Sequence, residues 1–331
     1  MKLGYMGTPE ISAELLKALL SAGHEVLYVI SNPDRPKGRS GTPQPSAVSQ
    51  VAMDAGLRLY RPEKPAEVLP ELQSLTVDAV IVFAYGSILP EGFLSLGQLG
   101  IFNLHGSLLP ELRGASPIQS AILQGMNRTG WTFQFVSLKM DCGDIVAECA
   151  LPIGEEETAA ELTQRMVPEG VRLVLDTLPE LQALAGKAKK QDENRATYCR
   201  KIRPEDSFLD WSKTATELHN QIRGMNPRPV ARTMLNDTLV KIYRSRVLEA
   251  MSLQAELASI QAEKQLMARA PGELLSIRLD GKPALCVVTG QAGLLQILSL
   301  QPQSKKQMDA ASFLNGHRIR AGEQFAMPAE I

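Results

Sequence analysis

The stretch Ile101-Phe-Asn-Leu-His-Gly-Ser-Leu-Leu-Pro110 decides how this 331-residue chain is organised. Its apolar residues predict a buried strand over 100–104, and Gly106 and Pro110 end that strand. Asn103 and His105 are two residues apart, so their side chains share one face near the carboxyl end of the strand. Open α/β sheets bind their ligands at this end of the strands.

A carboxylate for the same place comes from the second turn, Asp141-Cys-Gly-Asp144. Asn103, His105 and Asp141 together can hold a developing oxyanion and move a proton without a covalent nucleophile. The competing interpretation is a hydrogen-bonded structural histidine with aspartates that only cap turns. No metal is expected, because His105 has no second histidine at short spacing.

The residues around this strand alternate between apolar runs and helical patterns. Such alternation predicts an α/β domain with a doubly wound, mainly parallel sheet. Further strands are expected over 2–6, 24–30 and 77–84, with a less regular strand, antiparallel in the sheet, over 132–138. Helices are expected after Pro9 and over 47–55, 117–125 and 162–184, and a loop is expected over 32–45.

The composition changes near Gly186, where a polar and basic stretch begins. We expect a first domain over 1–186, a linker over 187–206 and a second domain over 207–331. The second domain carries short apolar runs separated by glycines, a pattern typical of a small β-barrel. Those runs are 239–243, 273–278, 284–289 and 294–300, and an amphipathic helix is expected over 251–270.

The bulk composition narrows the class of protein. Apolar residues make up 44 % of the chain, and no run of about eighteen of them predicts a membrane span. The N-terminal residues lack the pattern of a signal peptide, so a cytoplasmic location is expected. The four cysteines are scattered, so we expect reduced thiols. The first turn, Gly4-Tyr-Met-Gly7, lacks a third glycine and precedes Pro9, which disfavours dinucleotide binding.

The charge is unevenly distributed. Residues 1–200 hold 18 basic and 23 acidic side chains, a net charge of −5, whereas residues 201–331 hold 17 and 13, a net charge of +4. Basic side chains in the 32–45 loop and in the 187–206 stretch can contact a polyanion, although solvated surface segments remain the alternative. In the 32–45 loop these side chains are Arg35, Lys37 and Arg39.

Two loops follow neighbouring strands of the predicted sheet. One spans Ala84-Tyr-Gly-Ser-Ile-Leu-Pro90 and the other spans Gly106 to Pro110. Apolar side chains with exposed backbone groups can hold a flat heterocycle between two such loops.

Motifs along nearly the whole chain resemble the folate-dependent formyltransferases, and within them the methionyl-tRNA formyltransferase family. In the first domain they are Met6-Gly-Thr-Pro-Glu10, Pro33-Asp-Arg-Pro36, Ala84-Tyr-Gly86, Asn103-Leu-His105, Ser107-Leu-Leu-Pro110, Arg113-Gly-Ala115 and Asp141-Cys-Gly-Asp144. In the second domain they are Asp210-Trp-Ser212, Ile222-Arg223, Asn226-Pro227 and Lys305-Lys306 with Met308.

The resemblance implies a Rossmann-like first domain and an OB-like, tRNA-binding barrel. It implies formyl transfer from 10-formyltetrahydrofolate to methionyl initiator tRNA, with Asn103, His105 and Asp141 as the catalytic set. The implied folate slot comprises Ser107, Leu108, Leu109, Pro110, Ala84, Tyr85, Gly86 and Ile88. The tRNA contacts expected from the resemblance and the basic stretches are Arg35, Lys37, Arg39, Lys189, Lys190, Lys201, Lys305 and Lys306.

Three features depart from the family pattern and concern tRNA docking. Residues 38–43 lack the lysine pair that relatives often carry, Arg228 stands where the family usually has tryptophan, and 251–270 is longer than usual. Other acceptors for the same chemistry are water, in a formyl-folate hydrolase, or a sugar amine. A non-catalytic tRNA-binding module is the remaining alternative. The oligomeric state is open, with a monomer as the expectation.

Overall fold

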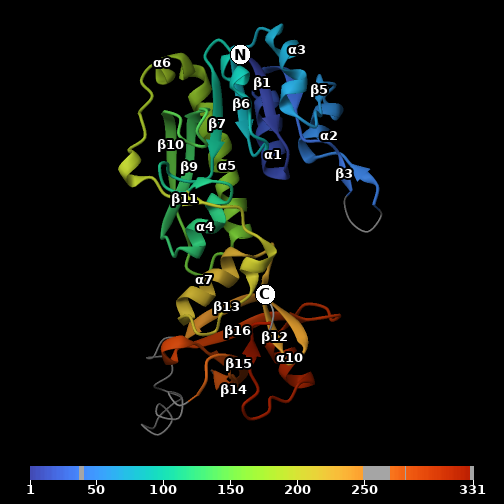
Figure 1. Cartoon of the computed structure of the whole chain (residues 1–331), viewed down its shortest axis with the longest axis vertical. Helices are drawn as coiled ribbons and strands as arrows, with labels where there is room; N and C mark the ends of the chain where they lie inside the picture. The colour runs from blue at the N-terminus through green and yellow to red at the C-terminus, as the bar shows by residue number, and fades with distance from the viewer. Residues whose placement is uncertain (37–40, 249–268, 280, 329–331) are drawn as a thin grey trace. The chain divides into compact units, whose positions relative to one another are not determined.

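The computed structural model describes residues 1–36, 41–248, 269–279 and 281–328, which form two compact units (Figure 1). The first unit comprises Met1–Ile118, Arg128–Pro152 and Thr163–Lys201. The second comprises Gln119–Asn127, Ile153–Leu162 and Ile202–Ile331.

The first unit is built on one twisted sheet with the strand order β10-β9-β7-β6-β1-β2-β5. Neighbours from β7 to β5 run parallel, whereas β9 is antiparallel to both β7 and β10. The doubly wound, mainly parallel sheet predicted from the sequence is therefore confirmed. The strands are β1 (Lys2–Gly7), β2 (Glu25–Ile30), β5 (Leu59–Tyr60), β6 (Ala79–Phe83), β7 (Ile101–His105), β9 (Arg128–Phe135) and β10 (Ile145–Pro152).

Sequence patterns did not indicate β5 or β10. The first has two residues, and the second lies beyond β9, where its largely exposed or half-buried side chains give no continuous apolar run. Short hairpin strands β3 (Arg35–Pro36) and β4 (Pro43–Gln44) lie within the predicted 32–45 loop. The short strands β8 (Arg113–Gly114) and β11 (Tyr198–Cys199) pair in parallel.

Helices connect the strands, mostly where the apolar spacing predicts them, but the short helix over 69–73 was not expected. They are α1 (Glu10–Ser21), α2 (Ala47–Asp54), α3 (Leu69–Gln73), α4 (Pro117–Leu123), α5 (Ala159–Thr177) and α6 (Leu181–Ala185). The expected helix over 162–184 is divided, because Pro179 cannot continue α5 and the 3-10 helix Leu178–Glu180 follows. Gly170 brings α5 close to Trp131, whose indole N–H donates to the Met166 carbonyl at 2.6 Å.

The second unit is an antiparallel barrel with the strand order β14-β15-β16-β13-β12-β18 and β17 beside β16. A bridge between Glu273 and Gln324 nearly closes it, because the Leu274 N–H donates to the Glu323 carbonyl at 2.8 Å. The predicted small barrel is therefore confirmed. Its strands are β12 (Ala231–Leu235), β13 (Thr238–Leu248), β14 (Leu274–Leu279), β15 (Lys282–Val288), β16 (Leu294–Pro302), β17 (Met308–Asp309) and β18 (Phe325–Ala326).

Helices α7 (Ala215–Gly224) and α10 (Ala310–Gly316) lie wholly in the second unit, which also includes most of α4 and the start of α5. Thr214 and Glu217 form a capping box that begins α7. The core between α7 and the barrel is apolar and includes Trp211, Leu218 and Phe325. Of the helix expected over 251–270, residues 251–268 lie outside the described part of the chain.

Residues 187–201, the larger part of the stretch expected to be a linker, are assigned to the first unit. Lys189 exchanges two backbone hydrogen bonds with Ile145, both at 2.8 Å, and β11 pairs with β8. Backbone pairing therefore fixes this polar stretch onto the sheet domain. Within the described ranges, no helix combines the length and apolar composition needed to cross a bilayer.

Candidate active site

The candidate site lies on one face of the β7–β9 ladder. Asn103 on β7 lies opposite Gln134 on β9, and His105 lies opposite Thr132. Directly paired residues share a face of the sheet, so these four polar side chains lie together. Phe102, Leu104, Phe133 and Phe135 occupy the other face, where Phe102 packs against both phenylalanines. Alternation along two strands thus separates a hydrophobic core face from a polar site face.

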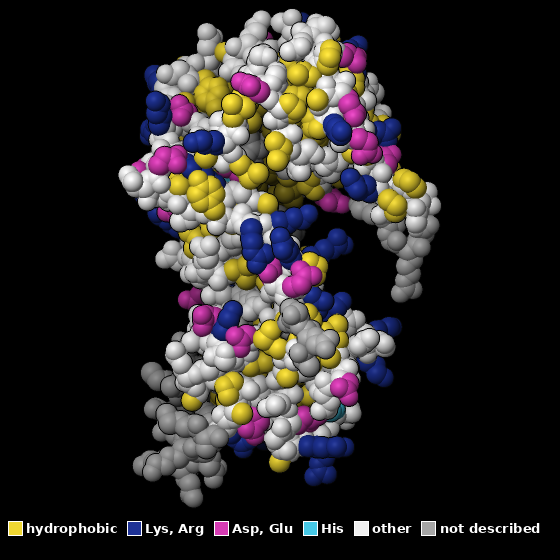
Figure 2. All heavy atoms as spheres, in the orientation of Figure 1, with side chains coloured by type: hydrophobic (Ala, Val, Ile, Leu, Met, Phe, Trp, Pro, Cys, Tyr) yellow, Lys and Arg dark blue, Asp and Glu magenta, His cyan; other side chains and the backbone are white. Residues whose placement is uncertain are grey.

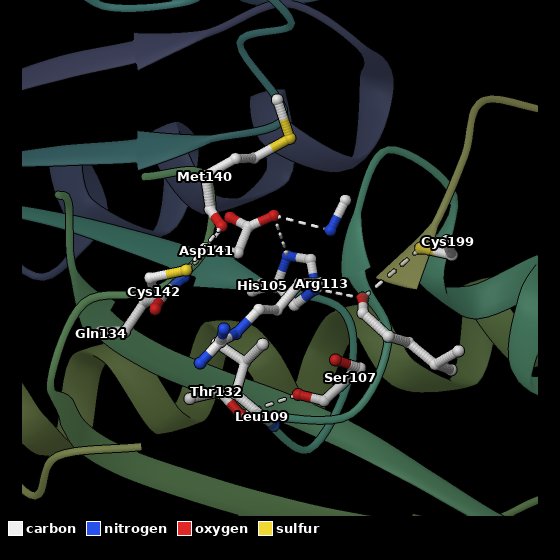
Figure 3. A network of polar contacts seen from close by, with 12 residues as sticks. His105, Ser107, Leu109, Arg113, Thr132, Gln134, Met140, Asp141, Cys142 and Cys199 are labelled. Carbon is white, nitrogen blue, oxygen red and sulfur yellow. Dashed lines mark hydrogen bonds and ion pairs between the residues drawn. The ribbon is translucent and has the colours of Figure 1, made fainter. Parts of the chain in front are cut away.

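His105 is held between a backbone carbonyl and Asp141. Its Nε2 lies 2.9 Å from the Leu112 carbonyl oxygen, so Nε2 carries the proton and donates it to that oxygen. The other ring nitrogen, Nδ1, lies 3.6 Å from Oδ2 of Asp141. Figure 3 shows the ring turned towards the carboxylate. This distance is longer than a hydrogen bond but places the imidazole and the carboxylate side by side.

Asp141 stands in a strained turn that positions its carboxylate. Its φ of 54° lies in the left-handed region that side chains rarely adopt. The Gly114 N–H donates to Oδ2 at 2.9 Å, and the Gln134 amide donates to Oδ1 at 3.4 Å (Figure 3). Its side chain is 14 % exposed, so the carboxylate keeps limited access to solvent and to a ligand.

The side chain of Asn103 is the free donor of this face. Asn103 is half-buried, and its amide has no hydrogen-bond partner within the described ranges of the chain. An uncommitted amide two residues before His105 can donate to an oxyanion in the site. The structure thus brings His105 and Asp141 into contact distance and places Asn103 on their face of the sheet.

Hydrogen bonds from Thr132 on β9 fix the 107–110 loop. The Thr132 hydroxyl donates to the Ser107 carbonyl at 2.7 Å and accepts from the Leu109 N–H at 3.0 Å. Ser107 itself donates to the Glu111 carbonyl, at 2.5 Å, and the Leu109–Pro110 peptide is cis. The Ser107 hydroxyl and Leu109 N–H are therefore committed inside the protein, while half-buried Leu108 remains available for apolar contact.

The 84–88 loop follows β6, which pairs with β7. Ala84 and Gly86 have φ of 49° and 85°, and the Tyr85 carbonyl accepts from Thr8 and Asn32. Burial raises the pKa of Tyr85 to about 12, and its hydroxyl has no hydrogen-bond partner among the residues described. Ile88 is 81 % exposed, which leaves a large apolar side chain beside the site edge.

Sequence reasoning missed a polar network behind Asp141. Gln191 contacts the backbone of the Asp141 turn, and Arg113, which is fully buried, contacts Gln191 and Glu193. The hydrogen bonds to Glu193 raise the pKa of Arg113, and the same contacts lower the pKa of Glu193. Arg113 lay in a motif already singled out, but nothing in a basic, polar stretch pointed to Gln191.

The side chains expected to contact tRNA are exposed wherever the structure describes them. Arg35 lies on β3, and Lys189, Lys190 and Lys201 lie on the first unit. Lys305 and Lys306 lie in the turn between β16 and β17. Lys37 and Arg39 lie outside the described residues. On the face drawn in Figure 2, basic and acidic side chains are interspersed over the first unit.

Chemically, the site offers an amide donor and an imidazole on one face of the sheet, with a carboxylate beside the imidazole. These groups suit an acyl transfer in which charge develops on a carbonyl oxygen and a proton leaves the nucleophile. Among the residues described, no group of three or more His, Cys, Asp or Glu side chains is arranged to hold a metal ion.

Comparison with known proteins places this site in a family. Residues 1–178 match the formyl transferase family, and residues 201–318 match the formyl transferase C-terminal domain. The methionyl-tRNA formyltransferase of Leptospira interrogans is 40 % identical over 98 % of this chain and 100 % of its own length. That of Bacillus subtilis is 36 % identical, covering 97 % and 96 %. The fold and site thus define a formyl transferase.

Solved structures agree at the level of the fold. An N-formyltransferase from Helicobacter canadensis, in complex with folinic acid and dTDP-3-aminofucose, has a TM-score of 0.63 at 19 % identity, covering 90 % of this chain and 98 % of its own. HypX from Aquifex aeolicus, in complex with tetrahydrofolic acid, has a TM-score of 0.59 at 17 % identity, covering 95 % and 46 %. The chain belongs to the methionyl-tRNA formyltransferase family.

Proposed function

We propose that this chain transfers the formyl group of 10-formyltetrahydrofolate to the α-amine of methionyl initiator tRNA. The observation that carries the proposal is the contact of His105 with Asp141, at 3.6 Å, together with the unpartnered amide of Asn103 on the same face of the sheet as His105. Membership of the family over nearly the whole chain supports the choice of donor and acceptor. A cytoplasmic location follows from this role, since initiator tRNA is used there.

The residues of the two loops beside the site suit a folate. A pterin needs flat apolar surface, and the two loops after β6 and β7 offer it. Ile88 and Leu108 supply the apolar surface, whereas the Tyr85 side chain packs in the core beside the sheet. Of the expected folate residues, Ser107 and Leu109 act through loop shape, because their polar groups are already bonded.

The reaction is a direct transfer. The neutral amine of the methionyl group attacks the formyl carbon and forms the new carbon–nitrogen bond. Asn103 donates to the oxyanion that develops on the formyl oxygen. The carbon–N10 bond then breaks, and the amine proton passes through the His105–Asp141 pair to N10 of the leaving tetrahydrofolate. Formyl-methionyl-tRNA and tetrahydrofolate are the products.

The test supplies 10-formyltetrahydrofolate with methionyl initiator tRNA, methionyl elongator tRNA, an amino sugar nucleotide or water alone. We expect rapid formylation of the initiator tRNA only. Asn103→Ala, His105→Ala and Asp141→Ala should each lower kcat by about 10²–10⁴. Near wild-type turnover by a folded His105→Ala protein would remove His105 from the mechanism.

Two results would contradict the function itself. Release of formate without an acceptor would indicate a hydrolase, and faster transfer to the sugar amine would indicate a sugar N-formyltransferase. Calorimetry with a non-reactive folate analogue separates an enzyme from a tRNA-binding module, because a module would show no heat of binding at high analogue concentration.

A further inference from the structure

Gln191 contacts the backbone of the turn that carries the candidate catalytic residue Asp141. Its Nε2 lies 2.8 Å from the carbonyl oxygens of both Asp141 and Gly143, and 3.0 Å from Oε1 of Gln134. Its Oε1 accepts from Nε of Arg113 at 2.9 Å. Only this orientation of the amide is satisfied, since the flipped group would face three acceptors with its oxygen. Gln191 therefore connects Arg113 to the backbone of the Asp141 turn.

Arg113 is fixed in turn by the residues that follow Gln191. Its side chain has no exposed surface, and Glu193 accepts two hydrogen bonds from it, at 3.0 and 2.8 Å. The Tyr198 hydroxyl lies 3.1 Å from Nη1. We call residues 189–199 the bracing segment, because its side chains neutralise and orient this buried guanidinium. A two-point contact between arginine and a carboxylate fixes direction as well as distance.

The contacts form a closed ring around Asp141. The Gly114 N–H, directly after Arg113, donates to the Asp141 carboxylate at 2.9 Å. The Arg113 side chain reaches the Asp141 carbonyl through Gln191. A Cβ on Gly114 would lie 2.1 Å from the Cys199 carbonyl oxygen, so β8 approaches the bracing segment as closely as only glycine allows. Arg113 and Gly114 thus hold both the carbonyl and the carboxylate of Asp141, a residue whose φ is unfavourable.

We propose that Gln191 is a positioning residue for Asp141 and that, with Arg113 and the bracing segment, it sets the gap between the carboxylate and His105. The side chain of Gln191 does not need to touch substrate. It acts by keeping the Asp141 turn in its left-handed conformation. The inference deepens the proposed function, which supplies the reaction used to measure it.

The first experiment compares full-length Gln191→Ala and Gln191→Glu with wild type under saturating substrates. We expect kcat to fall about 10–100-fold, because small displacements of a catalytic group are costly. KM values for folate and tRNA should change less than about threefold. Gln191→Glu keeps the acceptor for Arg113 but replaces the donor Nε2 with an oxygen that faces three acceptor oxygens. Its kcat should therefore fall at least as much as that of Gln191→Ala. Gln182→Ala, at an exposed position on α6, is the matched control and should behave as wild type.

A double-mutant cycle separates positioning from a general structural role. If Gln191 acts through Asp141, then adding Gln191→Ala to Asp141→Ala should lower single-turnover rates by less than about twofold. Equal losses in both backgrounds would overturn the proposal. So would a loss confined to KM.

Hydrogen exchange gives a readout that does not depend on turnover. In Gln191→Ala we expect faster exchange at the Gly114 amide and over residues 139–144, with β1 and β6 unchanged. Unchanged protection of Gly114 would contradict the inference. If wild type formylates no tRNA, the proposed function fails, while the exchange experiment still decides whether Gln191 holds the Asp141 turn.

Discussion

The carboxylate of Asp141 depends on a backbone conformation that few side chains accept. Asparagine and aspartate tolerate positive φ better than other residues with a Cβ, because their short polar groups bond locally. The position therefore combines two requirements, a tolerated left-handed turn and a negative charge 3.6 Å from His105. The two can be separated by one substitution.

Asp141→Asn should keep the fold and lose the chemistry. The amide oxygen can still accept from the Gly114 N–H, so we expect the free energy of unfolding to change by less than about 0.5 kcal/mol. Formylation should fall about 10²–10⁴-fold, because the proton acceptor is gone. Urea unfolding and single-turnover kinetics on the same protein measure both. A large loss of stability would mean that the charge holds the turn.

For individual residues, the sequence predicted positions in the site wherever spacing along a strand determines which face a side chain occupies. The i, i+2 relation of Asn103 and His105 predicted a shared face, and the structure places them opposite Gln134 and Thr132 on that face. Gln134 could have been suspected from its polar position in an apolar strand. Gln191 could not, because its contacts depend on the path of a stretch whose composition is that of a solvated linker.

Helix α7 contains a buried histidine that affects stability. Nδ1 of His219 lies 3.0 Å from the Ser245 hydroxyl, and Nε2 lies 3.1 Å from the Glu155 carbonyl oxygen. Burial lowers the pKa of His219, and the charges of Arg223 and Arg246 act in the same direction. The hydrogen bond to the Glu155 carbonyl and the charge of Glu156 oppose this shift. The folded second unit therefore binds fewer protons at this residue than the unfolded chain does.

This shift predicts a pH dependence of unfolding. The stabilising contribution of neutral His219 should be complete above the ordinary histidine pKa of about 6.5. It should be lost as the pH falls from there to the lowered pKa of the folded state, and the total loss is about 1.4 kcal/mol for each unit by which folding lowers that pKa. His219→Gln should show a shallower loss between about pH 7 and pH 5. Trp211 fluorescence in a Trp131→Phe background follows the second unit during urea unfolding. Identical slopes with and without His219 would refute the assignment.

At the level of elements, strands with strong apolar runs were predicted well, whereas the very short strands that only their pairing defines were not. β6 is a continuous apolar segment, β7 carries apolar residues at 101, 102 and 104, and both were expected within one or two residues. β11 and β8 have two residues each, and only their pairing defines them. Pro179 explains why 159–185 is divided, a break that helical spacing alone did not indicate.

For the molecule as a whole, the proposed tRNA contact is electrostatic and therefore sensitive to salt. The excess of basic side chains lies in residues 201–331, and the exposed Lys305 and Lys306 belong to that part. Each phosphate contact adds about 0.9 to the slope of log affinity against log salt concentration, because binding releases counterions. The two lysines occupy one short turn, so they can be removed together.

Lys305→Ala with Lys306→Ala should reduce that slope by up to about two and weaken tRNA binding at low salt. Filter binding or fluorescence anisotropy over a range of salt concentrations measures the change. Lys17→Ala is the control, since this exposed lysine pairs with Glu14 on α1. An unchanged slope in the double variant would exclude the turn between β16 and β17 from phosphate contact.

The position of the bracing segment along the chain has a consequence for biosynthesis. The residues of β7, β9 and the Asp141 turn are synthesised before residues 189–199. The nascent sheet can therefore assemble with its reactive side chains present but with the Asp141 carbonyl still lacking its donor from Gln191. Translation completes the site only when β11 has joined β8, after the rest of the sheet has been synthesised.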